Sequence, residues 1–381
     1  MKILLIGEYS RLHNSLKEGL QKLGHEVVLV GNGDHFKHYP VDILIDSPIS
    51  NRYIPEIIKK GIHRLFKIDV CDYEKLYRLK KQMPKLKNFD TVQLINEDAF
   101  SVSPKFQIKY LRKLIEQNKN IFLLSCGEDF TSISHYLKGI EKYSILTPYL
   151  QNPSLKKQYH FSLKYQTKPF EELHHFIYKN IKGVIASDMD YHLPLKEHRN
   201  YLGLIPNPVN TDNFNFTPLN ISKKINIFHG VNIKNYIKKG NGYFDEALNL
   251  IASKYPEKVD IVRTENLPYN IYIEKYNEAH IILDQVFSYD QGYNALEAMA
   301  QGKVVFTGAE KEWLEYYNLE EDTVAINALP DAEKIAKKLE WLILHPEKIL
   351  EISRNARDFI EKEHNYILSA KKYLETWESN C

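Results

Sequence analysis

Short apolar runs alternate with stretches of helical periodicity along most of the chain. The run Lys2–Ile6 is followed by leucines at helical spacing over residues 12–23, then by Gly24 and the β-branched run Glu26–Val30. This order predicts a strand, a helix that stops at a glycine, and a second strand. Further strand candidates in this half are Ile43–Ile45, Thr91–Ile95, Ile121–Ser125 and Gly183–Ala186. The alternation predicts a parallel sheet with helices on both faces.

A second alternation follows an interruption at residues 204–210. Pro206 and Pro208 lie too close together for a helix or a central strand, so an inter-domain linker is predicted from here to about Lys223. The strands predicted beyond it are Ile225–Phe228, Val259–Val262, Ile281–Leu283, Val304–Thr307 and Val324–Ile326, and the helices lie near 243–253, 271–279 and 294–300. We therefore expect two doubly wound α/β domains, with ligands in the cleft between them.

Composition agrees with two ordinary globular domains. The 381 residues are 43% hydrophobic, and 51 Lys and Arg face 49 Asp and Glu, a net charge of +2. This balance gives no case for a nucleic-acid partner. Cys71, Cys126 and Cys381 have no metal or disulfide spacing, which fits a reducing compartment. The N-terminus lacks the pattern of a signal peptide, and no window approaches the roughly 20 apolar residues of a membrane span. A cytoplasmic protein is expected.

The segment from Asp284 to Val305 carries the strongest chemical signal. A buried strand runs into a loop, Gly292 lets the backbone turn, and a helix is predicted from about Asn294. The amides at such a helix start suit a diphosphate, and Glu297, one turn further on, suits the hydroxyls of a ribose. Asn294 and Glu297 also fit a capping box, and on spacing alone that arrangement is the commoner one.

Residues 292–305 resemble the donor-site signature of glycosyltransferases of the GT-B fold. They read Gly292-x-x-x-x-Glu297-Ala298-Met299-Ala300-x-Gly302-Lys303-Val304-Val305. The pattern is most similar to the retaining family called glycosyltransferase group 1, or family 4, which reads E-G-F-G-x-x-x-x-E-A-M-A-x-G-x-P-V. The resemblance implies that Glu297 binds the ribose of the donor. It also implies phosphate contacts from Gly292 and from the amides of Tyr293, Asn294, Ala295 and Leu296.

The loop before this helix departs from the family pattern. Tyr289 stands where the family has its first glutamate, which contacts the transferred sugar. Asp290 is the catalytic candidate in its place if the loop shifts by one residue, and Asp284 is a second acidic candidate. Val304 replaces the usual proline.

A second match lies near the start of the C-terminal half. The motif ending in His229 and Gly230, followed by Lys239 before a helix, resembles the family arrangement that holds the diphosphate. Val231 stands in place of the family's arginine. Lys239 is predicted to stabilise charge on the departing diphosphate, and a solvated lysine in a basic loop is the equally frequent alternative. In the family the loop Leu267-Pro268-Tyr269 would pack on the nucleobase.

The first half supplies the expected acceptor side. The resemblance places a glycine loop at Gly7, near the reacting sugar, and an acidic residue after the strand that ends at Ser125. Asp129 and Glu128 are the candidates there, and each is also suited to capping the following helix. The hinge passage at 205–210 resembles the family string IPNGVD.

The expected protein is a glycosyltransferase that moves a sugar from a nucleotide-diphosphate donor to a glycan, lipid-linked or small-molecule acceptor, with retention and without a metal or other cofactor. The expected domains are 1–205 for the acceptor side, 206–360 for the donor, and 361–381 as a helix returning to the first domain. A catalytically lapsed protein that only binds nucleotide or glycan is the alternative. A sugar-nucleotide epimerase would share the site, whereas a dehydrogenase would need more glycines than Gly7 after its first strand. The basic stretch Lys80–Lys87 leaves open a peripheral contact with anionic lipid at the inner face of a membrane.

Overall fold

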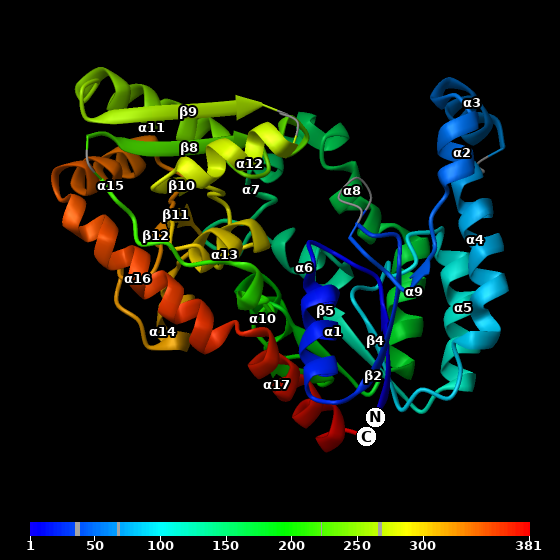
Figure 1. Cartoon of the computed structure of the whole chain (residues 1–381). Helices are drawn as coiled ribbons and strands as arrows, with labels where there is room; N and C mark the ends of the chain where they lie inside the picture. Colours follow the sequence, from blue (N-terminus) through cyan, green and yellow to red (C-terminus); the bar gives the residue numbers. More distant parts are fainter. Residues whose placement is uncertain (35–38, 67–68, 222, 266–268) are drawn as a thin grey trace.

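The protein forms two parallel sheets, each with helices on both faces (Figure 1). The computed structural model describes residues 1–34, 39–66, 69–221, 223–265 and 269–381. Within these residues the first sheet has the strand order β3-β2-β1-β4-β5-β6-β7 and the second the order β12-β11-β10-β8-β9. All of their strand pairs are parallel. The predicted α/β class with two doubly wound domains is confirmed.

The first sheet contains β1 (Lys2–Ile6), β2 (Glu26–Gly31), β3 (Ile43–Leu44), β4 (Thr91–Leu94), β5 (Asn120–Ser125), β6 (Gly183–Ala186) and β7 (Tyr201–Leu204). Its helices are α1 (Leu12–Lys22), α2 (Pro48–Tyr53), α3 (Glu56–Phe66), α4 (Val70–Gln82), α5 (Pro104–Gln117), α6 (Phe130–Tyr136), α7 (Thr147–Gln151), α8 (His160–Leu163), α9 (Lys168–Asn180) and α10 (Met189–Leu195).

The second sheet contains β8 (Ile225–Val231), β9 (Val259–Glu265), β10 (Ile281–Leu283), β11 (Val304–Thr307) and β12 (Ile326–Asn327). Its helices are α11 (Asn241–Lys254), α12 (Tyr269–Glu278), α13 (Tyr293–Ala300), α14 (Lys311–Tyr317), α15 (Ala332–Leu344) and α16 (Pro346–Glu363), and α17 (Tyr366–Ser379) ends the chain. No helix within the described residues is both long and apolar enough to cross a membrane.

The strands are apolar on both faces because helices cover both. Residues 3–6 of β1 are all fully buried, and so are the three residues of β10 to within 2% of their surface. The predicted strands lie where expected to within a few residues, except β7, which the sequence did not reveal. Its four residues, Tyr201-Leu202-Gly203-Leu204, are mostly half-buried at the end of the sheet, and Gly203 interrupts their apolar run directly before the proline-containing linker.

The C-terminal helix α17 returns to the first sheet and packs against α1. The two helices approach closely at Gly19, where a Cβ atom would lie 2.3 Å from the carbonyl oxygen of Tyr366. Trp377 is fully buried, and its indole Nε1 donates to Oε1 of Gln93 on β4 at 3.0 Å. Between the halves, Val209 N donates to His364 O at 2.7 Å and Tyr366 N donates to Val209 O at 3.1 Å.

We predict that Trp377→Ala lowers the free energy of unfolding by about 3–5 kcal/mol, because it empties a core position and leaves Gln93 without its partner. Urea denaturation followed by circular dichroism measures the change. Glu378→Ala, at the exposed neighbouring position, is the control and should stay within about 0.5 kcal/mol of the wild type. Equal stabilities for the two variants would contradict the anchoring role of α17.

Candidate active site at the junction of the two sheets

The strand order places the predicted site residues at the two positions where ligands of such sheets bind. In the first sheet the order reverses between β1 and β4, and in the second between β8 and β10. The loops after β1 and after β10 therefore lie at the carboxyl ends of strands that diverge to opposite sides. These loops contain Gly7 in one sheet and residues 284–292 in the other.

The helix that starts the donor motif has no side-chain cap. α13 begins at Tyr293, and its N-cap is Gly292 in an extended conformation, which has no side chain that could accept a hydrogen bond from the first turn. The capping box considered for Asn294 and Glu297 is therefore wrong, because Asn294 lies inside the helix and its amide group points to Asp284 at 3.4 Å.

The backbone N–H groups in the first turn of α13 fall into two groups, those with a hydrogen-bond partner inside the helix and those without. The N–H groups of Ala295 and Leu296 donate to the carbonyl of Gly292 at 2.9 and 3.1 Å. Those of Tyr293 and Asn294 belong to the helix start, where no carbonyl within the helix can accept them. Of the four amides predicted to hold phosphate, Tyr293 and Asn294 are thus the better placed.

Lys239 lies beside this helix start and is fixed there by Asp284. Its Nζ is 2.8 Å from Oδ1 of Asp284, whose side chain is 1% exposed. The backbone is fixed as well, since Val286 N donates to the carbonyl of Lys239 at 2.9 Å. Gly240 follows with φ of 70°, and a Cβ there would lie 2.7 Å from Cβ of Val286. Only a glycine lets the two loops approach this closely.

Oδ1 of Asp284 accepts hydrogen bonds from the side chains of both Lys239 and Asn294. Its Oδ2 atom is buried and has no hydrogen-bond partner among the described residues. The carboxylate thus orients a lysine and the first turn of a helix toward one place. The sequence had suggested Asp284 only as an acidic alternative to Tyr289, and the structure makes it a positioning residue.

His229 and Gly230, at the end of β8, lie next to this arrangement. The imidazole of His229 is fully buried, with Nδ1 3.4 Å from the carbonyl of Leu283 and Nε2 3.7 Å from Asp245. Burial lowers the pKa of His229 to about 4, so the ring is neutral at pH 7. Of the predicted nucleobase contacts, Leu267 and Pro268 lie outside the described residues, and Tyr269 is described only as the backbone start of α12.

Asp290 and Tyr289 connect the two halves of the protein. Asp290 is 3% exposed and accepts from Met189 N at 3.1 Å and from Gln291 N at 2.6 Å. Burial, with a smaller effect of neighbouring Asp190, raises the pKa of Asp290 to about 7. Tyr289 N donates to the Asp190 carboxylate at 3.1 Å. The positions that the resemblance assigns to the transferred sugar are therefore used in contacts between the halves.

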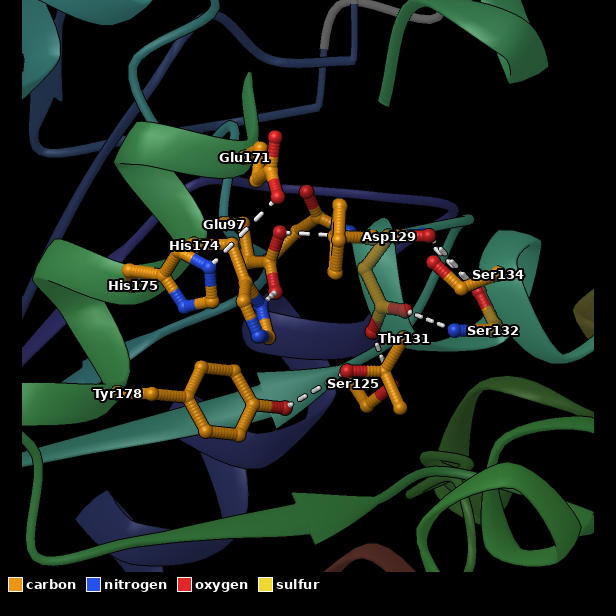
Figure 2. A network of polar contacts seen from close by, with 12 residues as sticks. Glu97, Ser125, Asp129, Thr131, Ser132, Ser134, Glu171, His174, His175 and Tyr178 are labelled. Atoms are coloured by element: carbon orange, nitrogen blue, oxygen red, sulfur yellow. Dashed lines mark hydrogen bonds and ion pairs between the residues drawn. The ribbon is translucent and has the colours of Figure 1, made fainter. Parts of the chain in front are cut away.

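Asp129, the catalytic candidate of the first half, forms the cap that its sequence position also allowed. Its Oδ1 accepts from Ser132 N at 2.7 Å in a capping box at the start of α6, and Ser125 Oγ donates to Oδ2. Figure 2 shows this cap beside a buried pair in which His174 Nδ1 lies 2.6 Å from Glu97 Oε1. The carboxylate of Asp129 is thus fully engaged within its own domain.

The neighbouring residue Glu128 faces the other half of the protein. Its carboxylate forms an ion pair with Lys238, which precedes Lys239 in the donor-side loop. Glu128 has φ of 74°, and its N–H donates to the hydroxyl of Tyr191 at 2.9 Å. A second ion pair between the halves joins Lys142 Nζ to Glu310 at 2.8 Å. The loops at the carboxyl ends of the two sheets are therefore in direct contact.

Glu8 is a candidate that the sequence analysis missed. It follows Gly7, whose φ of 91° and contact with Ile95, 2.1 Å from a Cβ placed there, admit only glycine. Glu8 is 1% exposed, and its Oε2 accepts from Asn14 N and Nδ2 at 2.8 and 2.7 Å. Its Oε1 has no hydrogen-bond partner among the described residues. Burial raises the pKa of Glu8 to about 7.

Glu8 lies within electrostatic reach of the donor helix. The charges of Glu8 and Glu297 both add to the effect of burial in raising the pKa of Tyr293, the first residue of α13. The sequence signal for Glu8 was its position, an acidic residue directly after the glycine that follows β1. The sequence could not show that Tyr293, far along the chain, would lie close enough for the charge of Glu8 to raise its pKa.

Two hollows of about 650 and 600 Å³ lie away from this junction. The first is lined by histidines and basic residues at the end of α9 and before β7, and the second by residues 213–220 together with 277–280. Neither contains a residue predicted to bind the donor. We locate the candidate site from the convergence of side chains on α13.

Comparisons with known proteins concern the sequence pattern of the C-terminal half and the fold of the whole chain. Residues 235–375, which include Lys239 and all of α13, match the sequence model of a family described as glycosyl transferase-like. No curated protein matches the sequence. The C-terminal half is therefore similar to glycosyl transferases in sequence.

Solved structures resemble the chain over its whole length. HepE from Anabaena, in complex with UDP and glucose, has a TM-score of 0.61 at 12% identity and covers 100% of both chains. Sucrose-phosphate synthase from Thermosynechococcus elongatus has a TM-score of 0.61 at 13% identity and covers 100% of this chain and 99% of its own. A glycosyltransferase from Rickettsia africae reaches 0.52 at 18% identity, with 99% and 97% covered. These similarities establish the GT-B fold.

We predict that Glu8 makes folding pH-dependent. Its pKa is about 7 in the folded protein against 4.5 ordinarily, so the folded state binds more protons, and stability falls as pH rises from about 4.5 to about 7. Above pH 7 the free energy of unfolding is then about 3 kcal/mol lower than below pH 4.5. Glu8→Gln, whose single amide oxygen can accept both Asn14 bonds, should remove this part of the pH dependence and be the more stable protein at pH 8. Thermal unfolding between pH 5 and pH 8 measures it.

Glu171→Gln is the control, since that side chain is 50% exposed and should leave the pH profile unchanged. If Glu8→Gln and the wild type lose stability in parallel over this range, Glu8 is charged in the folded protein throughout.

Proposed function

We propose that the protein is a glycosyltransferase that uses a nucleotide-diphosphate sugar as donor. The observation that carries the proposal is the convergence of Lys239 and the uncapped start of α13 on Asp284, at the strand-order reversal of the second sheet. A fixed cation next to unpaired helix amides is suited to a diphosphate. The family match over residues 235–375 supports the same reaction class.

The donor side is assigned in three parts. The amides of Tyr293 and Asn294 would hold the diphosphate, Glu297 the ribose hydroxyls, and Lys239 the leaving phosphate oxygens. HepE, which has the same fold, was solved with UDP-glucose, and this supports UDP as the first nucleotide to test. The roles of His229, Gly230, Leu267, Pro268 and Tyr269 toward the nucleotide remain predictions.

In the proposed reaction the bond between the anomeric carbon and the diphosphate oxygen breaks, and the acceptor oxygen forms the new glycosidic bond. With retention, the acceptor proton passes to a leaving phosphate oxygen on the same face of the sugar. The nucleoside diphosphate leaves with this proton, and no metal is part of the proposal. The acceptor, a glycan, a lipid-linked sugar or a small molecule, would enter against the first sheet near Gly7 and Glu8.

The proposed catalytic roles of Asp129 and Asp290 compete with their structural contacts. Each carboxylate accepts two hydrogen bonds from the protein. Together with Tyr289 in the place of the family's first glutamate, this favours a second candidate, a protein that binds the nucleotide without transferring the sugar. Hydrolysis of the donor in the absence of acceptor distinguishes the two, because a binding protein releases no free sugar.

We predict that one of the nucleoside diphosphates UDP, GDP and ADP stabilises the protein in a thermal-shift panel that also contains CMP and NAD. At 100 times its dissociation constant a ligand adds about 2.7 kcal/mol, which raises the unfolding midpoint visibly. Glu297→Ala should abolish the shift, because the ribose contact is lost. Glu333→Ala, an exposed glutamate in the first turn of α15, is the matched control and should keep it. The donor site is placed wrongly if no nucleotide shifts the wild type.

We predict that Lys239→Gln lowers donor hydrolysis or transfer by about 10²-fold, because it removes a positive charge from the leaving group. Glutamine keeps a hydrogen-bond donor for buried Asp284, so the unfolding midpoint without nucleotide should change little. Lys239→Arg should restore part of the rate. Addition of EDTA to the wild type tests the metal-free proposal, and a loss of activity restored by Mg²⁺ would contradict it.

A further inference from the structure

The surface of α2 and α3 is far more apolar than the rest of the exposed protein. Among the described residues, seventeen large apolar side chains are exposed, and eight of them lie between positions 44 and 77. Ile57 is 80% exposed, Leu65 75% and Tyr53 68%. We define the α2–α3 surface by the five exposed residues Ile49, Tyr53, Ile57, Ile58 and Leu65. Single exposed leucines are ordinary, whereas a cluster of this kind marks a binding surface.

The same part of the chain carries the protein's positive charge. Residues 48–87 contain eleven Lys and Arg against four Asp and Glu, a net charge of +7 in a chain whose total is +2. The remaining residues are therefore net negative. The stretch Lys80–Lys87, noted in the sequence, lies at the end of α4 and beyond it, and its lysines are exposed. Charge on this surface is concentrated and net positive.

Cations and apolar side chains alternate on α3. Ile58 and Leu65 are seven positions apart and share one face, while Lys60 and Arg64, four positions apart, lie along an adjoining one. The side chain of Lys60 is 76% exposed. At the neighbouring helices, Arg52 lies over the ring of Tyr53 at 5.3 Å and Lys81 over the ring of Tyr77 at 4.4 Å. This arrangement is typical of helices that lie in the surface of a bilayer, with apolar side chains inserted and cations at the headgroups.

Charge selects among the partners that an apolar surface can bind. A second copy of the chain would bring two surfaces of the same positive sign together, which is unfavourable, whereas an anionic lipid surface is complementary. Figure 1 shows α2 and α3 at the upper right, above α4 and at the opposite side of the view from α15 and α16. We propose that the α2–α3 surface binds the anionic face of a lipid bilayer and holds the protein there peripherally.

Co-sedimentation with vesicles tests the proposal on the full chain without nucleotide, so its outcome is independent of the proposed transfer reaction. The probes are vesicles of phosphatidylcholine alone and of equal parts phosphatidylcholine and phosphatidylglycerol. The wild type should bind the anionic vesicles about tenfold more strongly, and high salt should weaken this binding. Equal binding to both, or none to either, overturns the proposal.

Two variants separate the apolar and the charged contributions. Ile57→Ser with Leu65→Ser, and Lys60→Glu with Arg64→Glu, should each reduce binding to anionic vesicles about tenfold. The matched controls are Ile140→Ser, at a position 66% exposed in the same half, and Lys156→Glu with Lys157→Glu at two exposed positions. The controls should bind as the wild type does. All substituted side chains are exposed, and circular dichroism verifies that each variant is folded.

The remaining outcome concerns a second copy of the chain. If sedimentation equilibrium without lipid shows a dimer that Ile57→Ser with Leu65→Ser dissociates, the surface is a contact between copies and the lipid proposal is wrong. A monomer with unchanged mass in both proteins, together with vesicle binding lost in the variant, supports the bilayer contact.

Discussion

The carboxylate of Asp190, a partly buried residue, holds the loop after β10 against the first half of the protein. It accepts from the hydroxyl of Ser288 at 2.5 Å and from the backbone of Tyr289 at 3.1 Å. A further hydrogen bond joins the same two segments, since Asp290 accepts from the backbone N–H of Met189. Because these bonds join the loop after β10 to the start of α10, they fix where α13 begins relative to the first sheet. The closeness of Glu8 to the donor helix depends on the same contact.

This junction is built from acidic groups that burial makes partly neutral near pH 7. The pKa of Asp190 is raised to about 6 and that of Asp290 to about 7, with burial as the main cause. Protonation limits the repulsion that adjoining carboxylates would otherwise feel. The cations of the site, in contrast, are each matched to a carboxylate, as Lys239 is to Asp284 and Lys238 to Glu128. A departing diphosphate would thus meet a lysine whose place is already fixed.

The sequence predicted the fold well because central parallel strands, which are buried on both faces, consist of short runs of apolar residues. β1, β6, β10 and β11 lie at the predicted residues. β7 was missed because Gly203 interrupts its apolar residues and the prolines of the linker follow directly. The chemistry was predictable where it is local, as with Gly292 before a helix. The pairing of Asp290 with Met189, and of Tyr293 with the charge of Glu8, joins residues far apart along the chain, and no local pattern encodes such contacts. The capping box considered for Asn294 and Glu297 is absent because the helix begins earlier, with Gly292 as its N-cap residue.

The chain crosses between the two halves twice, and the two crossings are bonded to each other. Residues 205–209 lead from the first half to the second, and residues 364–366 lead back into α17, with Val209 hydrogen-bonded to both His364 and Tyr366. Two adjacent tethers resist twisting and sliding but leave bending about the line between them. Bending about this line is therefore the motion between the halves that the two crossings resist least. Such a rotation would separate the ion pairs Lys238–Glu128 and Lys142–Glu310 and leave the tethers intact.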